Sequence, residues 1–403
     1  MLFGKAVLHK IGMMMGICFL TGSLCACGDD TDVIKVADLQ QEIEVLPQED
    51  VIEEKVEDDK GEKIQGSYAD KEQPSQEISE EIYQPNEVSI TISAVGDVTL
   101  GNYPEQSYGY SLHETYDQTQ DPAYFFENVY DIFSSDDMTL VNLEGVLTNA
   151  EEKREGQTYC LKGRPEYVNI LTRGSVEAVG MANNHRLDYM QQGSDDTVAV
   201  LEEAGIVYAY GKNIGIYEVK GIRIGYVSVN ELEGGAVVEP QIEDGIARLK
   251  EEQADLILVC CHWGIEREYY PEDYQQILGR KCIDWGADLV IGHHPHVLQG
   301  IEEYQGKFII YSLGNFCFGA NRNPEDKDTM IFQQTFTFKD GIKQEDKNIQ
   351  VIPCSISSVS SRNDFKPTPA LGEDAKRIID KLNEYSRDFG VQFNEFGQQI
   401  NEY

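Results

Sequence analysis

Five apolar, strand-like runs in this chain end in side chains that can bind a metal ion. The residues that follow these runs are Asp97; Asn142 and Glu144; Asn183, Asn184 and His185; His262; and His293, His294 and His296. They include five of the seven histidines in the 403 residues. Ligands bind beyond the carboxyl ends of the strands in an open α/β sheet, so one sheet can bring these side chains into a single crevice. The pattern therefore predicts a metal site.

The segment His293-His294-Pro295-His296 follows Gly292, which permits a sharp exit from a strand. Neutral imidazole is a good ligand for Zn and Mn. A turn at Pro295 can aim both His294 and His296 into the crevice, so we predict these two as ligands. We expect His293 to pack nearby or to support a ligand.

The segment Asn183-Asn184-His185 is followed by Asp188. The amide oxygen of Asn184 is a neutral ligand, whereas His185 can sit beside the metal and donate a proton to a leaving oxygen. Asp188 can hold the imidazole in place. The alternative is a capped turn with a histidine that faces solvent.

The segment His262-Trp263-Gly264 follows a continuous apolar run, which places His262 at the lip of the sheet. Glu266 can orient a ligand or bind substrate, and the sequence leaves both roles open. Asn315, in the segment Tyr311–Phe316, can orient a substrate or a loop, with a buried turn as the alternative.

Asp97 and Glu144 supply the negative charge that a divalent site needs, although strand-end carboxylates also cap helices. Two divalent ions about 3.5–4 Å apart can clamp an oxyanion and generate hydroxide near neutral pH. Such a pair needs a bridging carboxylate, for which we predict Glu144. Asp97 and His296 then complete one side, and the other side consists of Asn184, His262 and His294. Asn142, Glu266, His293 and Asn315 remain as residues that bind substrate or support ligands.

The formal charge of −38 argues against a nucleic-acid partner, because phosphate binding needs clustered Lys and Arg. The acidity is uneven: residues 29–88 hold 20 Asp and Glu against 5 Lys and Arg. Few aromatic residues and no sustained periodicity occur there. We therefore expect residues 28–87 to be a disordered acidic tether.

The first 27 residues are typical of a lipoprotein signal peptide. Lys5 and Lys10 precede an apolar stretch from Ile11 to Ala26, which is short for a membrane span. The end, Leu24-Cys25-Ala26-Cys27, resembles a bacterial lipobox with Cys27 as the lipidated residue. An ordinary signal peptide cut nearby is the alternative. A lipid at Cys27 would anchor an exported protein to the outer face of the cytoplasmic membrane, on a tether reaching roughly 40–45 Å.

Beyond the tether, strand-like and helix-like segments alternate, which predicts an α/β domain over 88–360 with some antiparallel pairing near its end. An extension with a helix follows over 361–403. Expected strands include 88–95, 221–229, 307–312 and 330–338. Expected helices are 122–133, 164–173, 194–204 with Ser194 as N-cap and Gly205 at its end, 242–253, 271–285 and 373–387.

Six motifs in order resemble the CapA/PgsA family of bacterial poly-γ-glutamate capsule synthesis proteins. They are Gly-Asp-x-x-Leu-Gly (96–101), Asn-Leu-Glu-Gly (142–145), Asn-Asn-His-x-x-Asp (183–188), His-Trp-Gly-x-Glu (262–266), Gly-His-His-Pro-His-Val-Leu-Gln (292–299) and Tyr-Ser-Leu-Gly-Asn-Phe (311–316). The family is similar in fold to the calcineurin-like metallophosphoesterases, an α/β sandwich with mixed β-sheets flanked by helices and a dinuclear metal centre.

The resemblance implies metal positions at Asp97, Glu144, Asn184, His262, His294 and His296, with His185 as the acid. It implies one or two divalent ions (Mn, Zn or Fe), an anionic polymer, and membrane synthase subunits as partners. The expected function is poly-γ-glutamate synthesis, export or anchoring; the alternative is metal-dependent hydrolysis of phosphoesters or of γ-glutamyl or wall amides. Two positions depart from the pattern. Thr99 stands where phosphoesterases have a histidine ligand, and Met190 stands where the family usually has glycine.

Overall fold

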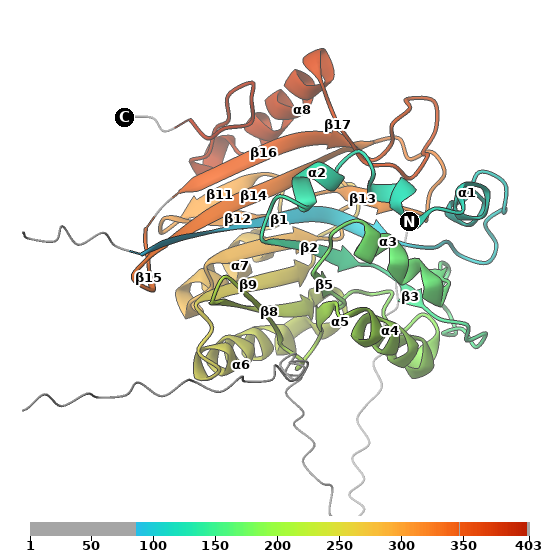
Figure 1. The fold of residues 1–403 in the computed structure, drawn as a ribbon, viewed down its shortest axis with the longest axis horizontal. Helices are drawn as coiled ribbons and strands as arrows, with labels where there is room; N and C mark the ends of the chain where they lie inside the picture. The colour runs from blue at the N-terminus through green and yellow to red at the C-terminus, as the bar shows by residue number, and fades with distance from the viewer. Residues whose placement is uncertain (1–85, 346, 401–403) are drawn as a thin grey trace, which may run out of the picture. The chain divides into compact units, whose positions relative to one another are not determined.

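The computed structural model describes residues 86–345 and 347–400, and within them two large β-sheets are stacked (Figure 1). The first has nine strands: β1 (Glu87–Thr99), β2 (Met138–Leu143), β5 (Ala178–Gly180), β6 (Val207–Ala209), β13 (Asn315–Phe318), β14 (Asp328–Lys339), β15 (Ile342–Lys343), β16 (Asn348–Ser355) and β17 (Thr368–Pro369). The order is β17-β16-β14-β1-β2-β5-β6, with β13 beside β1 and β15 beside β14. Strands β1, β2, β5 and β6 are parallel, whereas β14 runs antiparallel to β1.

The second sheet has six strands in the order β11-β12-β10-β9-β8-β7. They are β7 (Gly215–Val219), β8 (Ile222–Asn230), β9 (Leu256–His262), β10 (Leu289–His293), β11 (Ile301–Tyr304) and β12 (Lys307–Ile310). The four central strands are parallel, and the two edge strands are antiparallel to their neighbours. A small pair, β3 (Val146–Leu147) with β4 (Lys162–Gly163), lies apart from both sheets. The predicted α/β architecture with mixed sheets is confirmed.

The α-helices are α1 (Leu112–Thr119), α2 (Tyr130–Phe133), α3 (Val168–Arg173), α4 (Met190–Ala204), α5 (Glu231–Gly234), α6 (Val238–Glu251), α7 (Asp273–Trp285) and α8 (Gly372–Tyr385). Short 3₁₀ helices are η1 (Pro122–Phe126), η2 (Pro165–Tyr167), η3 (Gly235–Val237) and η4 (Arg387–Phe389). The predicted helices 122–133 and 164–173 are each broken into a 3₁₀ turn and a short α-helix. In both, proline at the first position starts the turn.

The prediction of Ser194 as an N-cap is wrong, because α4 begins at Met190 and Ser194 is buried within it. The Ser194 hydroxyl instead accepts a hydrogen bond of 2.9 Å from the Arg186 side chain. Met190 has a φ of +55°, a left-handed conformation that favours glycine. Gly205 ends the helix with a φ of +71°, as predicted.

Three apolar layers hold the sheets and helices together. Between the sheets, Ile92 of β1 and Leu258 of β9 belong to one buried cluster, as the alternation of apolar residues in β1 requires. Leu171 of α3 packs on the outer face of the first sheet, and Ile246 of α6 packs on the outer face of the second. The arrangement is a four-layer α/β/β/α sandwich.

The expectation that one sheet carries all five metal-binding runs is wrong. Strands β1, β2 and β5 belong to the first sheet, whereas β9 and β10 belong to the second. The carboxyl ends of these strands nevertheless meet at one edge of the sandwich, because the two sheets are stacked with their parallel strands in a common direction (Figure 1). The site is therefore built across the interface between two sheets.

The segment after residue 360, expected as an extension, packs into the same body. Strand β17 pairs with β16, and the helix predicted over 373–387 is α8. Ile378 and Leu382 of α8 are buried in the cluster between the sheets. Among the described residues, no helix has the length and apolar character that crossing a membrane requires. The predicted signal peptide, Cys27 and nearly all of the tether lie outside the described residues.

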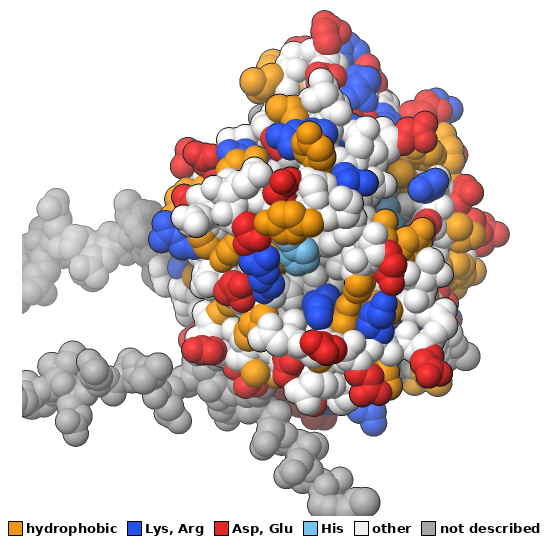
Figure 2. Space-filling view, turned by 90° about the vertical axis from the view of Figure 1, so that its right-hand side faces the viewer, with side chains coloured by type: hydrophobic (Ala, Val, Ile, Leu, Met, Phe, Trp, Pro, Cys, Tyr) orange, Lys and Arg blue, Asp and Glu red, His pale blue; other side chains and the backbone are white. Residues whose placement is uncertain are grey.

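Charged side chains of both signs are mixed on the face of the molecule shown in Figure 2. On the face shown in Figure 2, basic and acidic side chains alternate, without a large area of one sign.

Candidate metal centre

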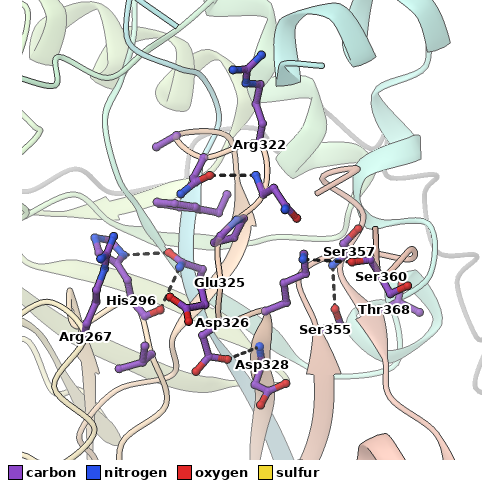
Figure 3. Close-up of a pocket in the computed structure, with 18 of the residues that line it drawn as sticks. Arg267, His296, Arg322, Glu325, Asp326, Asp328, Ser355, Ser357, Ser360 and Thr368 are labelled. Carbon is purple, nitrogen blue, oxygen red and sulfur yellow. Dashed lines mark hydrogen bonds between the residues drawn. The ribbon is translucent and has the colours of Figure 1, made fainter. Parts of the chain in front are cut away.

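A cavity of about 1320 Å³ opens at the edge of the sandwich where the parallel strands end. Glu144, His185 and His296 line one part of it, and the loop between β13 and β14 forms another part of its wall (Figure 3). Side chains from both sheets thus face a single space, as an α/β strand-end site requires.

Asp97 lies at the floor of this site because β1 passes very close to the start of β13. The backbone N–H of Asp97 donates to the Gly314 carbonyl at 2.9 Å, and Asp97 pairs in register with Asn315. A Cβ at Gly96 would lie 2.2 Å from the Gly314 oxygen, so only glycine fits there. Asp97 is fully buried. Its position depends on this close contact between distant segments.

The Asp97 carboxylate is surrounded by nitrogen atoms of three side chains. Asn142 Nδ2 lies 2.8 Å from Oδ1, and His296 Nδ1 lies 3.1 Å from Oδ2. His293 Nδ1 is 3.4 Å from Oδ1. Burial by itself raises the pKa of Asp97, but the interactions with His293 and His296 outweigh it and hold the pKa well below its usual value. Asp97 is therefore a carboxylate at neutral pH.

Glu144 follows β2 and is buried, with its two oxygens in different surroundings. Oε2 accepts a hydrogen bond of 3.0 Å from Thr99 Oγ1. Oε1 is buried without a hydrogen-bond partner. Around Oε1 lie three imidazole nitrogens, the Nε2 atoms of His296 at 3.7 Å, His262 at 3.9 Å and His185 at 4.0 Å. Burial raises the pKa of Glu144, with a smaller opposing effect from His296.

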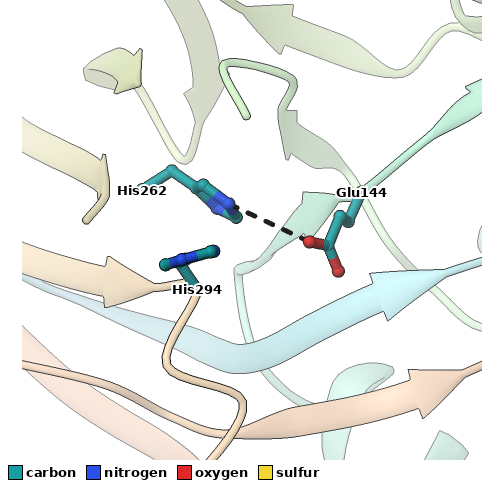
Figure 4. Close-up of side chains that lie close together, drawn as sticks. All are labelled: Glu144, His262 and His294. Atoms are coloured by element: carbon teal, nitrogen blue, oxygen red, sulfur yellow. Dashed lines mark ion pairs between the residues drawn. The ribbon is translucent and has the colours of Figure 1, made fainter. Parts of the chain in front are cut away.

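His262, at the end of β9, and His294, just after β10, complete one donor group with Glu144 (Figure 4). Their ring centres are 4.8 Å apart. His262 Nε2 also lies 2.8 Å from Asn184 Oδ1. Burial and the neighbouring His294 hold the pKa of His262 well below its usual value, and burial with His296 lowers the pKa of His294 to about 4. Both rings are therefore neutral near pH 7, which is the form that binds metals.

His296 belongs to a second donor group, with Asp97 and Glu144, and a third group joins it to His294 and the exposed Glu266. Burial lowers the pKa of His296, but Glu144 and Asp97 outweigh this and raise it to about 10. Asn315 Oδ1 lies 2.9 Å from His296 Nδ1, and Asn315 Nδ2 donates to the His296 carbonyl at 3.1 Å. His294 and His296 have φ values of +97° and +58°, so the turn at Pro295 is strained.

His185 lies next to the donor groups, and a carboxylate on the far side of its ring fixes its orientation. Its Nδ1 is 2.7 Å from Asp188 Oδ2, and that carboxylate also accepts the backbone N–H of Leu161 at 2.6 Å. Burial lowers the pKa of His185, but the bond to Asp188 and the charge of Glu144 outweigh it, so the net pKa is raised. The imidazole is thereby oriented with Nε2 toward Glu144.

The residues fit a divalent cation. A buried oxygen of Glu144 and the buried Nδ1 of His294 both lack a hydrogen-bond partner, which is unusual in a folded protein. A cation between Glu144, His262 and His294 would satisfy the Glu144 oxygen, and carboxylate with imidazole is a donor set that suits Zn, Mn or Fe. In each donor group the ligand atoms lie within 4.8 Å of one another.

All predicted site residues within the described part of the chain come together here. They are Asp97, Asn142, Glu144, Asn184, His185, Asp188, His262, Glu266, His293, His294, His296 and Asn315. Glu144 is common to two donor groups, one with Asp97 and His296 and the other with His262 and His294, whereas the third group joins His294 to His296.

Sequence reasoning missed two supporting residues. Thr99, noted only as a missing histidine, binds one oxygen of Glu144 and leaves the other for a ligand. Asn183 donates through Nδ2 to the Leu143 carbonyl at 2.8 Å and accepts the His185 N–H at 3.2 Å, so it ties two strand ends together. For both residues, the only signal in the sequence was a polar side chain that stands within a motif and had no assigned role.

The family described as bacterial capsule synthesis protein PGA_cap matches residues 91–320, more than half of the chain. This chain belongs to that family. The matched range contains every residue of the donor groups. Among curated relatives, "PGA biosynthesis protein CapA" of Bacillus subtilis (strain 168) is 31% identical over 249 residues, 57% of this chain and 63% of that protein. "Capsule biosynthesis protein CapA" of Bacillus anthracis is 28% identical over 272 residues, 60% of this chain and 63% of that protein.

The PGA_cap chain therefore spans a little under two thirds of the length of these two relatives. Among solved structures, a hypothetical protein from Thermus thermophilus is similar with a TM-score of 0.42 and 17% identity, over 66% of this chain and 98% of that one.

Proposed function

We propose that this protein acts in the synthesis, export or anchoring of poly-γ-glutamate, through a divalent metal centre at Glu144. Two relatives whose names state PGA or capsule biosynthesis support the polymer, and family membership supports the same process. The observation that carries the metal centre is the buried Glu144 Oε1, which faces three imidazole Nε2 atoms at 3.7–4.0 Å. The metal would be Mn, Zn or Fe, with one or two ions bound.

A bound divalent ion would supply positive charge that polarises an oxyanion. The chain's own residues set the geometry around it. Asp97 and Glu144 bring negative charge, and His262 and His294 bring neutral nitrogen. Asn142 and Asn315 hold Asp97 and His296 in orientation through bonds of 2.8 and 2.9 Å. Because these groups are buried, a substrate in the cavity meets them with little competing water.

A genetic test uses a B. subtilis strain that lacks its PGA biosynthesis protein CapA. We expect the full chain to restore extracellular poly-γ-glutamate, and Glu144→Gln and His296→Ala to fail while accumulating to equal levels. Glu218→Gln, a change of an exposed carboxylate on β7, is the matched control. Restoration by Glu144→Gln as full as by the parent chain would contradict a role for the metal centre. Failure of the parent chain at normal abundance would contradict the polymer assignment.

The same proposal includes export and a lipid anchor at Cys27, on the outer face of the cytoplasmic membrane. The lipobox-like sequence Leu24–Cys27 and the acidic segment that follows support it. The anchor would place the folded domain near membrane synthase subunits. Labelling with a palmitate analogue should mark the parent chain and not Cys27→Ala, which we expect in the medium. Equal labelling of Cys27→Ala, or its retention in washed membranes, would contradict the anchor.

A second candidate function is metal-dependent hydrolysis of a phosphoester or of an amide in the polymer or wall. The observation that favours it is His185, which Asp188 holds at 2.7 Å with Nε2 toward Glu144. A raised pKa favours the protonated form of this imidazole, so Nε2 can donate a proton to a leaving oxygen or nitrogen.

Protein loaded with Mn or Zn should then hydrolyse generic phosphodiesters or γ-glutamyl amides. His185→Ala should lose this activity while retaining bound metal. No turnover by the parent chain, or equal turnover by His185→Ala, would contradict hydrolysis and leave the first proposal intact.

A further inference from the structure

The cavity is larger than the metal centre needs. It extends from His296 to Arg377 on α8, with a volume of about 1320 Å³. Sites for single small molecules are usually about 300–1,000 Å³. A small ligand at the metal centre would leave most of the wall without contacts. The size therefore favours a ligand made of several linked units.

Three cations in the cavity wall lack a carboxylate partner among the described residues: Arg267, Arg322 and Lys327. Arg322 Nη1 donates to the Gly109 carbonyl at 3.0 Å, and Lys327 Nζ to the Ser360 carbonyl at 3.3 Å. Neutral carbonyls orient these side chains but leave their charge uncompensated.

Arg267 lies close to His296 of the metal centre (Figure 3). Its backbone N–H donates to the Pro295 carbonyl at 2.8 Å, which ties it to the turn that carries His294 and His296. Its side chain stands beside His296 in the cavity. A ligand group bound there would lie next to the donor groups.

The other two cations of the wall are already neutralised. Arg377 donates to both oxygens of Asp328 at 2.5 and 2.8 Å, and Lys381 binds Asp326 at 2.6 Å. Apart from the two glutamates at the metal centre, Glu325 is the one carboxylate of the wall without a cation partner in the described residues. Away from the metal centre the unpaired charges of the wall are thus three cations and one carboxylate, whereas the whole wall, Glu144 and Glu266 included, has five Lys and Arg against six Asp and Glu.

Neutral polar groups lie between the free cations. The side chains of Asn323 and Ser360 line the cavity and make no hydrogen bond within the described residues. Both can donate to and accept from an amide. Carboxylates recurring along an amide-linked chain would match this wall, because an amide can both donate to and accept from these side chains, whereas a polyphosphate can only accept from them.

We propose that this wall binds an extended acidic polyamide, with successive carboxylates on Arg267, Lys327 and Arg322 and amide links at Asn323 and Ser360. The inference rests on the proposed function, because it assigns the polymer's binding surface beside the same metal centre. Recognition by unpaired cations makes the affinity depend on ionic strength.

The test measures fluorescence anisotropy of a labelled γ-linked glutamate decamer with the full chain, with and without bound metal. Arg267→Ala, Arg322→Ala and Lys327→Ala should each weaken binding by about tenfold, the factor expected for one charge-assisted hydrogen bond. Glu325→Gln should bind at least as tightly as the parent chain. Arg173→Ala removes an exposed arginine outside the cavity and should change nothing.

Because the three cations are exposed or half-buried, these variants should keep the melting temperature of the parent chain. Binding that is equal in the parent and the three variants would overturn the cation assignment and leave the genetic test of the proposed function unaffected. No binding by the parent chain would overturn the inference, while restoration of polymer in cells would still support the proposed function. Tighter binding of a polyphosphate of equal length would overturn the polyamide assignment.

Discussion

Glu144→Gln should affect stability in opposite ways with and without metal. In the metal-free protein Glu144 is a buried carboxylate with one unpartnered oxygen, and burial raises its pKa. Glutamine can keep the hydrogen bond from Thr99 through its amide oxygen and removes the buried charge. The substitution should therefore be neutral or stabilising by up to about 1 kcal/mol in the absence of metal.

With saturating metal Glu144→Gln should instead lower the stability of the protein, because Glu144 is common to two of the donor groups. Loss of one carboxylate ligand that weakens metal binding by about 100-fold would remove about 2.7 kcal/mol of ligand-induced stability. For a domain of this size about 1 kcal/mol corresponds to roughly 2 °C, so the metal-induced rise in melting temperature should shrink by about 5 °C.

Differential scanning calorimetry with EDTA, and with Mn or Zn added, measures both effects on one preparation. Glu218→Gln on β7 carries the same charge change outside the site. A metal-induced rise as large in Glu144→Gln as in the parent chain would refute the assignment of Glu144 as a ligand. A large destabilisation of the metal-free variant would refute the reading of Oε1 as an unsatisfied atom.

Three further predictions concern other parts of the fold. Gly96→Ala should lower the free energy of unfolding by about 1–3 kcal/mol, because its Cβ would lie 2.2 Å from the Gly314 oxygen. Gly109→Ala is the control, since the nearest atom to a Cβ there is 3.8 Å away. Equal melting temperatures of the two variants would contradict the packing argument. Burial raises the pKa of Glu177 to about 7, above the value of 4.5 for a free glutamate. The folded state therefore binds this proton more tightly than the unfolded state does. The stability of the protein should fall as the pH rises from about 4.5 through 7. Glu177→Gln should flatten this part of the curve of melting temperature against pH, and an unchanged slope would exclude Glu177 as its cause. Under the hydrolase proposal Asp188→Asn should leave metal content unchanged and reduce turnover by about 10²–10⁴, and a parallel loss of metal would instead indicate a structural role.

The chemistry of the site could be predicted from the sequence to a large extent. Each ligand type follows an apolar run, and strand ends are encoded locally by the change from apolar to polar residues. Asp97, Glu144 and His262 were found in this way. The helices predicted over 271–285 and 373–387 lie within two residues of α7 and α8, whereas those predicted from 194 and from 242 begin four residues earlier, as α4 and α6.

Local signals failed where tertiary contacts compete with them. Ser194 has the chemistry of an N-cap, but α4 begins a turn earlier and buries it against Arg186. The helix expected over 122–133 is interrupted, and Phe126 and Phe133 from its two halves pack against the same residue, Phe316. Propensity is a weak guide when burial of neighbouring residues decides the outcome.

The division of the metal-binding strands between two sheets could come only from the tertiary structure. Whether β9 pairs beside β2 or stacks across from it depends on contacts between residues more than 100 positions apart. The same holds for the bond from Thr99 to Glu144, which leaves one oxygen free, and for the cavity that gathers Arg267, Arg322 and Lys327.

By itself the sequence determined which atoms can act as ligands and that they stand at strand ends, because side-chain chemistry and hydrophobic period are properties of short segments. The tertiary structure decided which of those atoms share a pocket, which are left without a partner, and which charges face the ligand. Those properties depend on distances through space, and the packing of two sheets sets them.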